Sequence, residues 1–280
     1  MNTQDKQALR ILVRAREDFQ AQRKRMDNRI GRKADGTDQE IDERAFRAED
    51  LESFVDIADA AKEQEKEIEK KLKKLLKRFD IWNEYLCDVK GVGTISAAHI
   101  IGEFNIHIGS TVSKLWQYAG LNPGMIRGKK RIQTKNPKTY EPQNKSWKIL
   151  KRAEDHVLVL TDKRIRGDRL TAGFISPYNK GLKTALMGVL ASGFIKAQAP
   201  MALDYYYPYK ERLEKSEREV NHNGEMTPWK DVSKGHRDMA AKRYMVKMFL
   251  KDLYAVWRGL EGLDVREPYQ EEYLGHEHGN

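Results

Sequence analysis

Apolar residues recur at helical spacing along roughly the first eighty residues of the chain. They predict one helix over residues 4–30 and a second helix over about residues 40–79. Between the two, the break is predicted at residues 31–37, where the sequence ADGTD (residues 34–38) supplies a glycine and turn-forming aspartates. We therefore predict that residues 1–80 form a long helical hairpin that resembles a coiled coil. Such a hairpin buries its apolar stripe against itself, a second copy of the chain or the next domain.

Residues 81–276 follow a tighter pattern that predicts a compact helical domain. Apolar helices are predicted over residues 178–200 and 236–262, where proline and glycine, respectively, supply the stop signals. The run HVLVL, residues 156–160, fits either a short strand or a buried helical turn. The segment NHNGEMTPWKDVSKGH is predicted to be a loop. The expected fold class is all-α, with a loose tail at residues 277–280.

Nearly all of the net positive charge lies in one segment. The formal net charge is +10, and residues 127–169 hold 14 Lys and Arg against 5 Asp and Glu. Two prolines and few apolar residues predict an insertion at residues 125–170 that forms a loop or a ribbon. Charge concentrated in this way is typical of a surface that binds a polyanion. The candidate nucleic-acid contacts are Arg127, Lys129, Lys130, Arg131, Lys135 and Lys148, with Trp147 as the candidate aromatic contact.

The sequence VKGVGT places two glycines at the junction of two predicted helices, as in a helix-hairpin-helix motif. Glycine suits a turn that needs a positive φ or a close approach of the backbone to a ligand. Backbone N–H groups at the start of the second helix can hold a phosphate oxygen. The candidate contacts here are Lys90, Gly91, Val92, Gly93 and Thr94. A plain turn between two helices explains the same glycines.

Several blocks of the sequence, in order, resemble a known family. The blocks YLCDVKGVGTISAAHIIGEF, KLWQYAGLNPG, YNKGLKTALMGVLASGFIKAQAP and GHRDMAAKRYMVKMFLKDLYAVWRGLEG resemble a group of insertion-sequence transposases. These transposases have a helix-hairpin-helix C-terminal domain, and their full-length members are guided by a bridge RNA. The resemblance covers about residues 81–276. It implies a transposase-like DNA-binding protein of a mobile genetic element that acts in DNA transposition or recombination.

Two departures from the family limit the function that the resemblance implies. Full-length members begin with an RNase-H-like domain that carries four acidic metal ligands, whereas the first eighty or so residues here show no strand pattern. Asp35, Asp38 and Asp42 are interpreted as ordinary surface or capping carboxylates. The family's nucleophilic serine follows the AGL-x-P motif, but here the first hydroxyl after AGLNPG is Thr134 and the first serine is Ser146. The chain is therefore expected to be a short member without the catalytic domain, and no catalytic residue is assigned.

Two other functions stay open at this point. One is a divergent serine-type recombinase that uses a hydroxyl such as that of Ser146 or Thr134. The other is a helical scaffold that binds another protein. A DNA ligand is favoured, RNA is an alternative, and the long helices favour a homo-oligomer.

Composition adds a few expectations. No cofactor and no metal site are predicted. Because no run of about 18 apolar residues occurs, we expect no membrane partner, and a single cysteine is consistent with the cytoplasm. That cysteine, Cys87, is expected to be a small core residue.

Overall fold

The computed structural model describes residues 3–31, 48–222 and 224–266. The chain forms two compact units, an N-terminal unit (Met1–Glu103) and a C-terminal unit (Phe104–Asn280). The division falls after Glu103, whereas the sequence analysis divides the chain after residue 80. The predicted turn at residues 32–37, the start of the second predicted helix up to residue 47, Asp35, Asp38, Asp42 and the tail at 277–280 lie outside the described residues.

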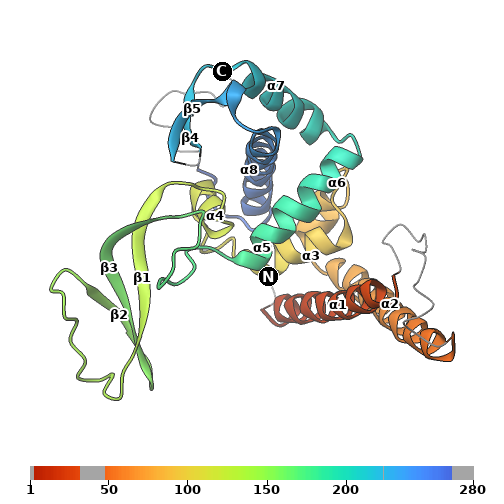
Figure 1. Cartoon of the computed structure of the whole chain (residues 1–280), viewed down its shortest axis with the longest axis horizontal. Coiled ribbons are helices and arrows are strands. Elements are labelled where there is room, and N and C mark those ends of the chain that lie inside the picture. The colour runs from red at the N-terminus through yellow and green to blue at the C-terminus, as the bar shows by residue number, and fades with distance from the viewer. Residues whose placement is uncertain (1–2, 32–47, 223, 267–280) are drawn as a thin grey trace. The chain divides into compact units, whose positions relative to one another are not determined.

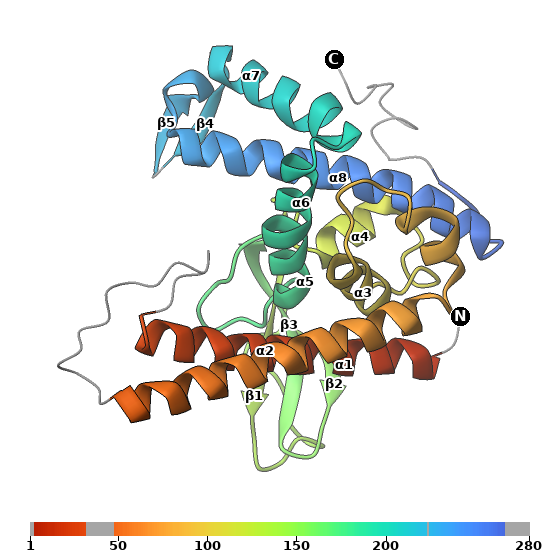
Figure 2. The ribbon, with the colours of Figure 1, turned by 90° about the vertical axis from the view of Figure 1, so that its right-hand side faces the viewer.

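Two long helices of the N-terminal unit lie side by side, as the sequence predicts. They are α1 (Thr3–Arg29) and α2 (Ala48–Leu76), shown in red and orange in Figures 1 and 2. Leu9 and Val13 of α1 and Ala58, Leu72 and Leu76 of α2 are among the buried residues. An apolar stripe with a period near 3.6 therefore positions the two helices against each other.

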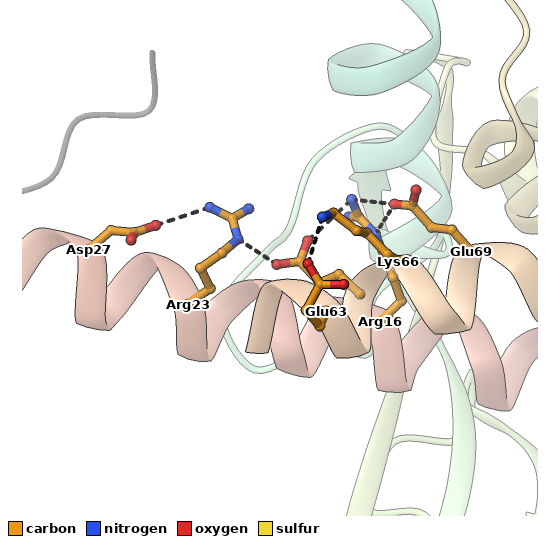
Figure 3. A network of polar contacts seen from close by, with 7 residues as sticks. Arg16, Arg23, Asp27, Glu63, Lys66 and Glu69 are labelled. Carbon is orange, nitrogen blue, oxygen red and sulfur yellow. Dashed lines mark hydrogen bonds and ion pairs between the residues drawn. The ribbon is translucent and has the colours of Figure 1, made fainter. Parts of the chain in front are cut away.

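Ion pairs connect the same two helices (Figure 3). Glu65 of α2 is 5% exposed, and its Oε1 accepts a hydrogen bond from Arg23 Nε at 2.6 Å. Arg16 Nη2 lies 3.4 Å from Glu65 Oε2 and 2.9 Å from Glu69 Oε1. The hydrogen bond to Glu65 raises the pKa of the Arg23 guanidinium, so Arg23 keeps its positive charge. One buried carboxylate thus fixes the register of α1 on α2.

The rest of the N-terminal unit is a short π-helical segment, η1 (Trp82–Leu86), a turn, and α3 (Thr94–Glu103). Helix α3 packs on α1, and Gly102 of α3 lies beside Leu9 and Arg10 of α1. Arg10 Nε also donates to the carbonyl oxygen of Gly102 at 2.6 Å. Cys87, which follows η1 directly, is exposed, so the expectation of a core cysteine is wrong. The buried side chain in this stretch is that of the neighbouring Leu86, which is 0% exposed.

The C-terminal unit is organised around the long helix α8 (Lys234–Leu260). Phe194 packs edge-on against Phe249 at 5.3 Å between ring centroids, and Trp257 is 1% exposed. Trp116 is also buried and donates from Nε1 to the carbonyl oxygen of Lys247 at 3.1 Å. Figure 2 shows α7 lying along α8. The other helical elements of this unit are α4 (Val112–Tyr118), α5 (Lys180–Thr184), η2 (Ala185–Leu190), α6 (Ala191–Lys196), η3 (Ala202–Tyr206), α7 (Tyr207–Lys215) and η4 (Trp229–Asp231).

Two antiparallel sheets correct the expected all-α class. The first sheet has the strand order β1-β3-β2 and contains β1 (Met125–Gln133), β2 (Lys148–Arg152) and β3 (His156–Arg166). The second is the hairpin of β4 (Glu219–His222) and β5 (Glu225–Pro228), with Gly224 at φ +98° in its turn. The hairpin lies where a loop was predicted, because glycine at that position allows a tight strand connection. The basic insertion is a ribbon, and HVLVL belongs to a strand.

No helix among the described residues is long and apolar enough to cross a membrane.

The buried Glu65 gives a testable consequence for stability. Replacing it (Glu65→Gln) leaves the charges of Arg16 and Arg23 without their shared buried partner, so the free energy of unfolding is expected to fall by about 2 kcal/mol. Glu63→Gln is the matched control, because Glu63 is exposed and forms its ion pair with exposed Lys66. That control should change stability by less than about 0.5 kcal/mol. Urea unfolding of both variants measures the difference, and equal effects would contradict the role given to Glu65.

Candidate nucleic-acid interface

The sheet of β1, β2 and β3, called the basic ribbon below, has one apolar face. Its register pairs Ile126 with Ile165 and Ile132 with Val157, and Val159 and Ile165 are buried. Gly128 lies in the same row, and a Cβ there would come within 2.4 Å of the Phe174 ring. Phe174 therefore covers the glycine and closes this face. In Figure 1 the basic ribbon extends away from the helices of its own unit.

The opposite face of the basic ribbon carries its charge. Alternation along each strand places three cations of β1, two of β2 and two of β3 on this side, and all seven are exposed. Arg166 of β3 pairs with Asp168, and the other six are called the cation face: Arg127, Lys129, Arg131, Lys148, Lys151 and Arg164.

Cations of this face lie close to one another across the strands. Arg127 is directly opposite Arg164. Lys129 and Lys148 both pair with Leu160, one from each side. Like charges in such positions destabilise a sheet. None of the six cations is within 4 Å of a carboxylate in the part of the chain that the structure describes, so their charge is left for a partner.

Arg127 differs from the other cations of this face, because its guanidinium is already engaged. Its Nε donates to the carbonyl oxygen of Thr161 at 2.8 Å, and its Nη2 donates to the carbonyl oxygen of Ser146 at 3.1 Å. Thr161 in turn donates from Oγ1 to the carbonyl oxygen of Gly128 at 2.9 Å. Arg127 therefore braces the strands where the β1–β3 register shifts, and keeps its charge at the surface.

Lys130 and Trp147 lie on the apolar side, away from the cation face. Lys130 Nζ is 4.8 Å from the centroid of the Phe174 ring and 5.6 Å from the Trp147 ring. Trp147 donates from Nε1 to Asp162 Oδ1 at 3.1 Å, and this hydrogen bond lowers the pKa of Asp162. The structure thus divides the candidates that the sequence grouped together. Lys135 lies between β1 and β2 and is exposed.

Two cations of the cation face, Lys151 and Arg164, were missed as candidates. Arg164 and Arg166 alternate with Ile165 as in a strand, whereas Lys151 lies between Leu150 and Arg152 and shows no such alternation. Both missed cations could be assigned to this face only once the strands and their register were known.

The Gly-Val-Gly turn belongs to the N-terminal unit, between η1 and α3. The N–H of Val92 donates to the carbonyl oxygen of Val89 at 3.0 Å, and Gly91 has φ +95°. The turn itself therefore requires Gly91. Gly93 is different, because a Cβ there would meet nothing within 4 Å. Thr94 is the first residue of α3, and Lys90 and Gly93 are exposed.

Neither candidate hydroxyl lies in a nucleophile-and-base arrangement among the described residues. Ser146 donates from Oγ to Asn144 Oδ1 at 2.8 Å and lies near the carboxylate of Asp162. Thr134 Oγ1 accepts a hydrogen bond from the N–H of Asn136. Across residues 3–31, 48–222 and 224–266, no group of three or more His, Cys, Asp or Glu side chains is arranged to hold a metal ion.

In comparisons with protein-family models, curated proteins and solved structures, nothing matched this chain. The transposase resemblance therefore stays a prediction.

The two glycines of the turn predict different outcomes. Gly91→Ala places a side chain at positive φ and is expected to cost about 1 kcal/mol of stability. Gly93→Ala enters open space and is expected to leave stability within about 0.5 kcal/mol of the parent. If the turn holds a phosphate, Gly93→Ala also weakens nucleic-acid binding, since the added methyl blocks the approach. Thermal unfolding and DNA binding of both variants test this, and unchanged DNA binding by Gly93→Ala favours a plain turn.

Proposed function

We propose that this chain is a nucleic-acid-binding protein that holds the phosphate backbone of DNA on the cation face of the basic ribbon. The observation that carries the proposal is the arrangement of its exposed cations: Arg127 lies directly opposite Arg164, and none of the six has a carboxylate within 4 Å among the described residues. Like charges directly opposite each other lower the stability of a sheet, and a bound polyanion neutralises them. Phosphate contacts fix position on a nucleic acid and carry no sequence information.

A role in transposition or recombination is the finer part of the proposal. It is supported by the ordered blocks of sequence that resemble insertion-sequence transposases. In this role the chain binds DNA in the cytoplasm, and a partner supplies the chemistry. The long helices α1 and α2 provide a surface on which two copies of the chain can associate.

The salt dependence of DNA binding tests the proposal. Each lysine or arginine that neutralises a phosphate adds about −0.9 to the slope of log K against log salt on duplex DNA. A triple variant, Lys129→Gln, Arg131→Gln and Lys151→Gln, is therefore expected to make the slope less steep by about 2 to 3. Fluorescence anisotropy with a labelled duplex between about 50 and 200 mM salt measures it.

The control removes three lysines that already have an acidic partner. Lys66, Lys70 and Lys215 each pair at 2.6 Å with Glu63, Glu67 and Glu211, respectively. Changing all three to Gln alters the net charge by the same amount, and the slope should stay close to that of the parent. Equal effects of the two triple variants would show that overall charge, and no defined surface, governs binding. A structured RNA of similar length, titrated in parallel, distinguishes DNA from RNA as the preferred ligand.

A further inference from the structure

A second group of cations lies at the end of β3, around one buried carboxylate. Arg166 donates from Nε and Nη2 to the two carboxylate oxygens of Asp168 at 2.9 and 3.0 Å. Lys183 of α5 donates from Nζ to the carbonyl oxygen of Asp168 at 2.6 Å. Arg243 Nη2 of α8 lies 3.8 Å from Asp168 Oδ2. The Asp168 side chain is only 5% exposed, so it lies beneath the cations that it connects.

The positive charge here exceeds what Asp168 balances. Three cations, Arg166, Lys183 and Arg243, act on this one carboxylate, and the charge of Arg169, which follows Asp168 in the chain, acts on Lys183 as well. Burial lowers the pKa of Lys183, and the charges of Arg243, Arg166 and Arg169 lower it further, against the opposing charge of Asp168. The same three arginines lower the pKa of His236, after burial and the charge of His222. The lowered pKa values of Lys183 and His236 are therefore both consistent with an excess of positive charge around Asp168.

One donor in this group has no acceptor. Arg243 Nε is buried and forms no hydrogen bond with any residue that the structure describes. Buried polar groups of native proteins are almost always paired, and an exception indicates a missing ligand or ordered water. The remainder of the group can be reached from solvent, since Arg169 is exposed and the Arg166 and Arg243 side chains are 44% and 32% exposed.

We propose that Arg166, Arg169, Lys183 and Arg243 form a binding site for one phosphate group. Arginine guanidinium groups bind tetrahedral oxyanions in bidentate fashion, and a lysine adds a point charge. Asp168 holds Arg166 in place and is itself shielded from the anion by burial.

The source of the phosphate follows from the register of the basic ribbon. Arg166 pairs with Met125 and lies on the same side of β3 as Arg164, next to the cation face. The site therefore continues the cation face at its base and takes a backbone phosphate of the same nucleic acid. This assignment of the source rests on the proposed function. A free phosphorylated small molecule has the same chemistry, and the two are separated experimentally below.

The first experiment uses inorganic phosphate as the probe and needs no nucleic acid. Phosphate is titrated against chloride at matched ionic strength, and the dissociation constant is taken from the rise in unfolding temperature. The parent protein is expected to bind phosphate, and Arg243→Gln and Arg169→Gln are each expected to weaken binding about tenfold. Arg218→Gln is the control, because Arg218 is exposed and belongs to the same unit. It should bind phosphate like the parent.

Two results overturn the site: no stabilisation of the parent by phosphate, or equal stabilisation of the parent and of both site variants. Arg169 is exposed, so its variant keeps the test valid if Arg243→Gln folds poorly.

The second experiment measures duplex DNA binding by the same variants. A loss of affinity in Arg243→Gln and Arg169→Gln, with none in Arg218→Gln, supports a nucleic-acid phosphate. Unchanged DNA affinity alongside lost phosphate binding overturns that source and assigns the site to a free phosphorylated ligand. If the parent does not bind DNA at all, the proposed function fails, while the phosphate titration still reports on the site.

Discussion

The side chains of a β-strand alternate between two faces, and in the basic ribbon this alternation gathers six exposed cations on one face and the buried residues Val157, Val159 and Ile165 on the other. Ile126, Gly128 and Ile132 of β1 lie on one side, while Lys129 and Arg131 lie on the other. The apolar side can close because Gly128 leaves room for the Phe174 ring. Once that side is packed, the register is fixed, since a slip of one residue would bury the cations. The cation face is therefore a consequence of how the opposite face packs.

Cations gathered on one face repel one another, and this repulsion favours the binding of a polyanion. Arg127 and Arg164 are directly opposed, and the phosphate site proposed at Asp168 adds more positive charge at the base of the same sheet. Positive and negative charges are more nearly equal in number around Glu65, where two arginines form ion pairs with three carboxylates. Within one chain, the helical hairpin neutralises its charges and the basic ribbon keeps them available. That contrast favours a polyanionic partner for the basic ribbon.

The sequence was a good guide where one period dominates. The stripes of α1, α2 and α8 have helical spacing, and these helices lie close to the predicted ranges. The sheets were less predictable, because cations interrupt the apolar alternation of β1 and the register of both β1–β3 and β2–β3 shifts. The faces on which Lys130 and Trp147 lie were likewise not predicted from the sequence. The contacts that hold Lys130 and Trp147 come from Phe174 and Asp162, which are distant in sequence, so the face of each residue could be assigned only once the strands were known. Gly91 was predictable because a turn requires its positive φ, whereas nothing local identified Cys87 as exposed.

The most direct test of the central claim is lysine footprinting with and without a DNA duplex. Acetylation of each lysine by a small reagent would be read by mass spectrometry. The account predicts that Lys129, Lys148 and Lys151 become protected on DNA, while Lys66 and Lys70 react as in the free protein. Protection of the α2 lysines with none on the basic ribbon, or equal protection everywhere, would contradict the assignment of the cation face as the nucleic-acid interface.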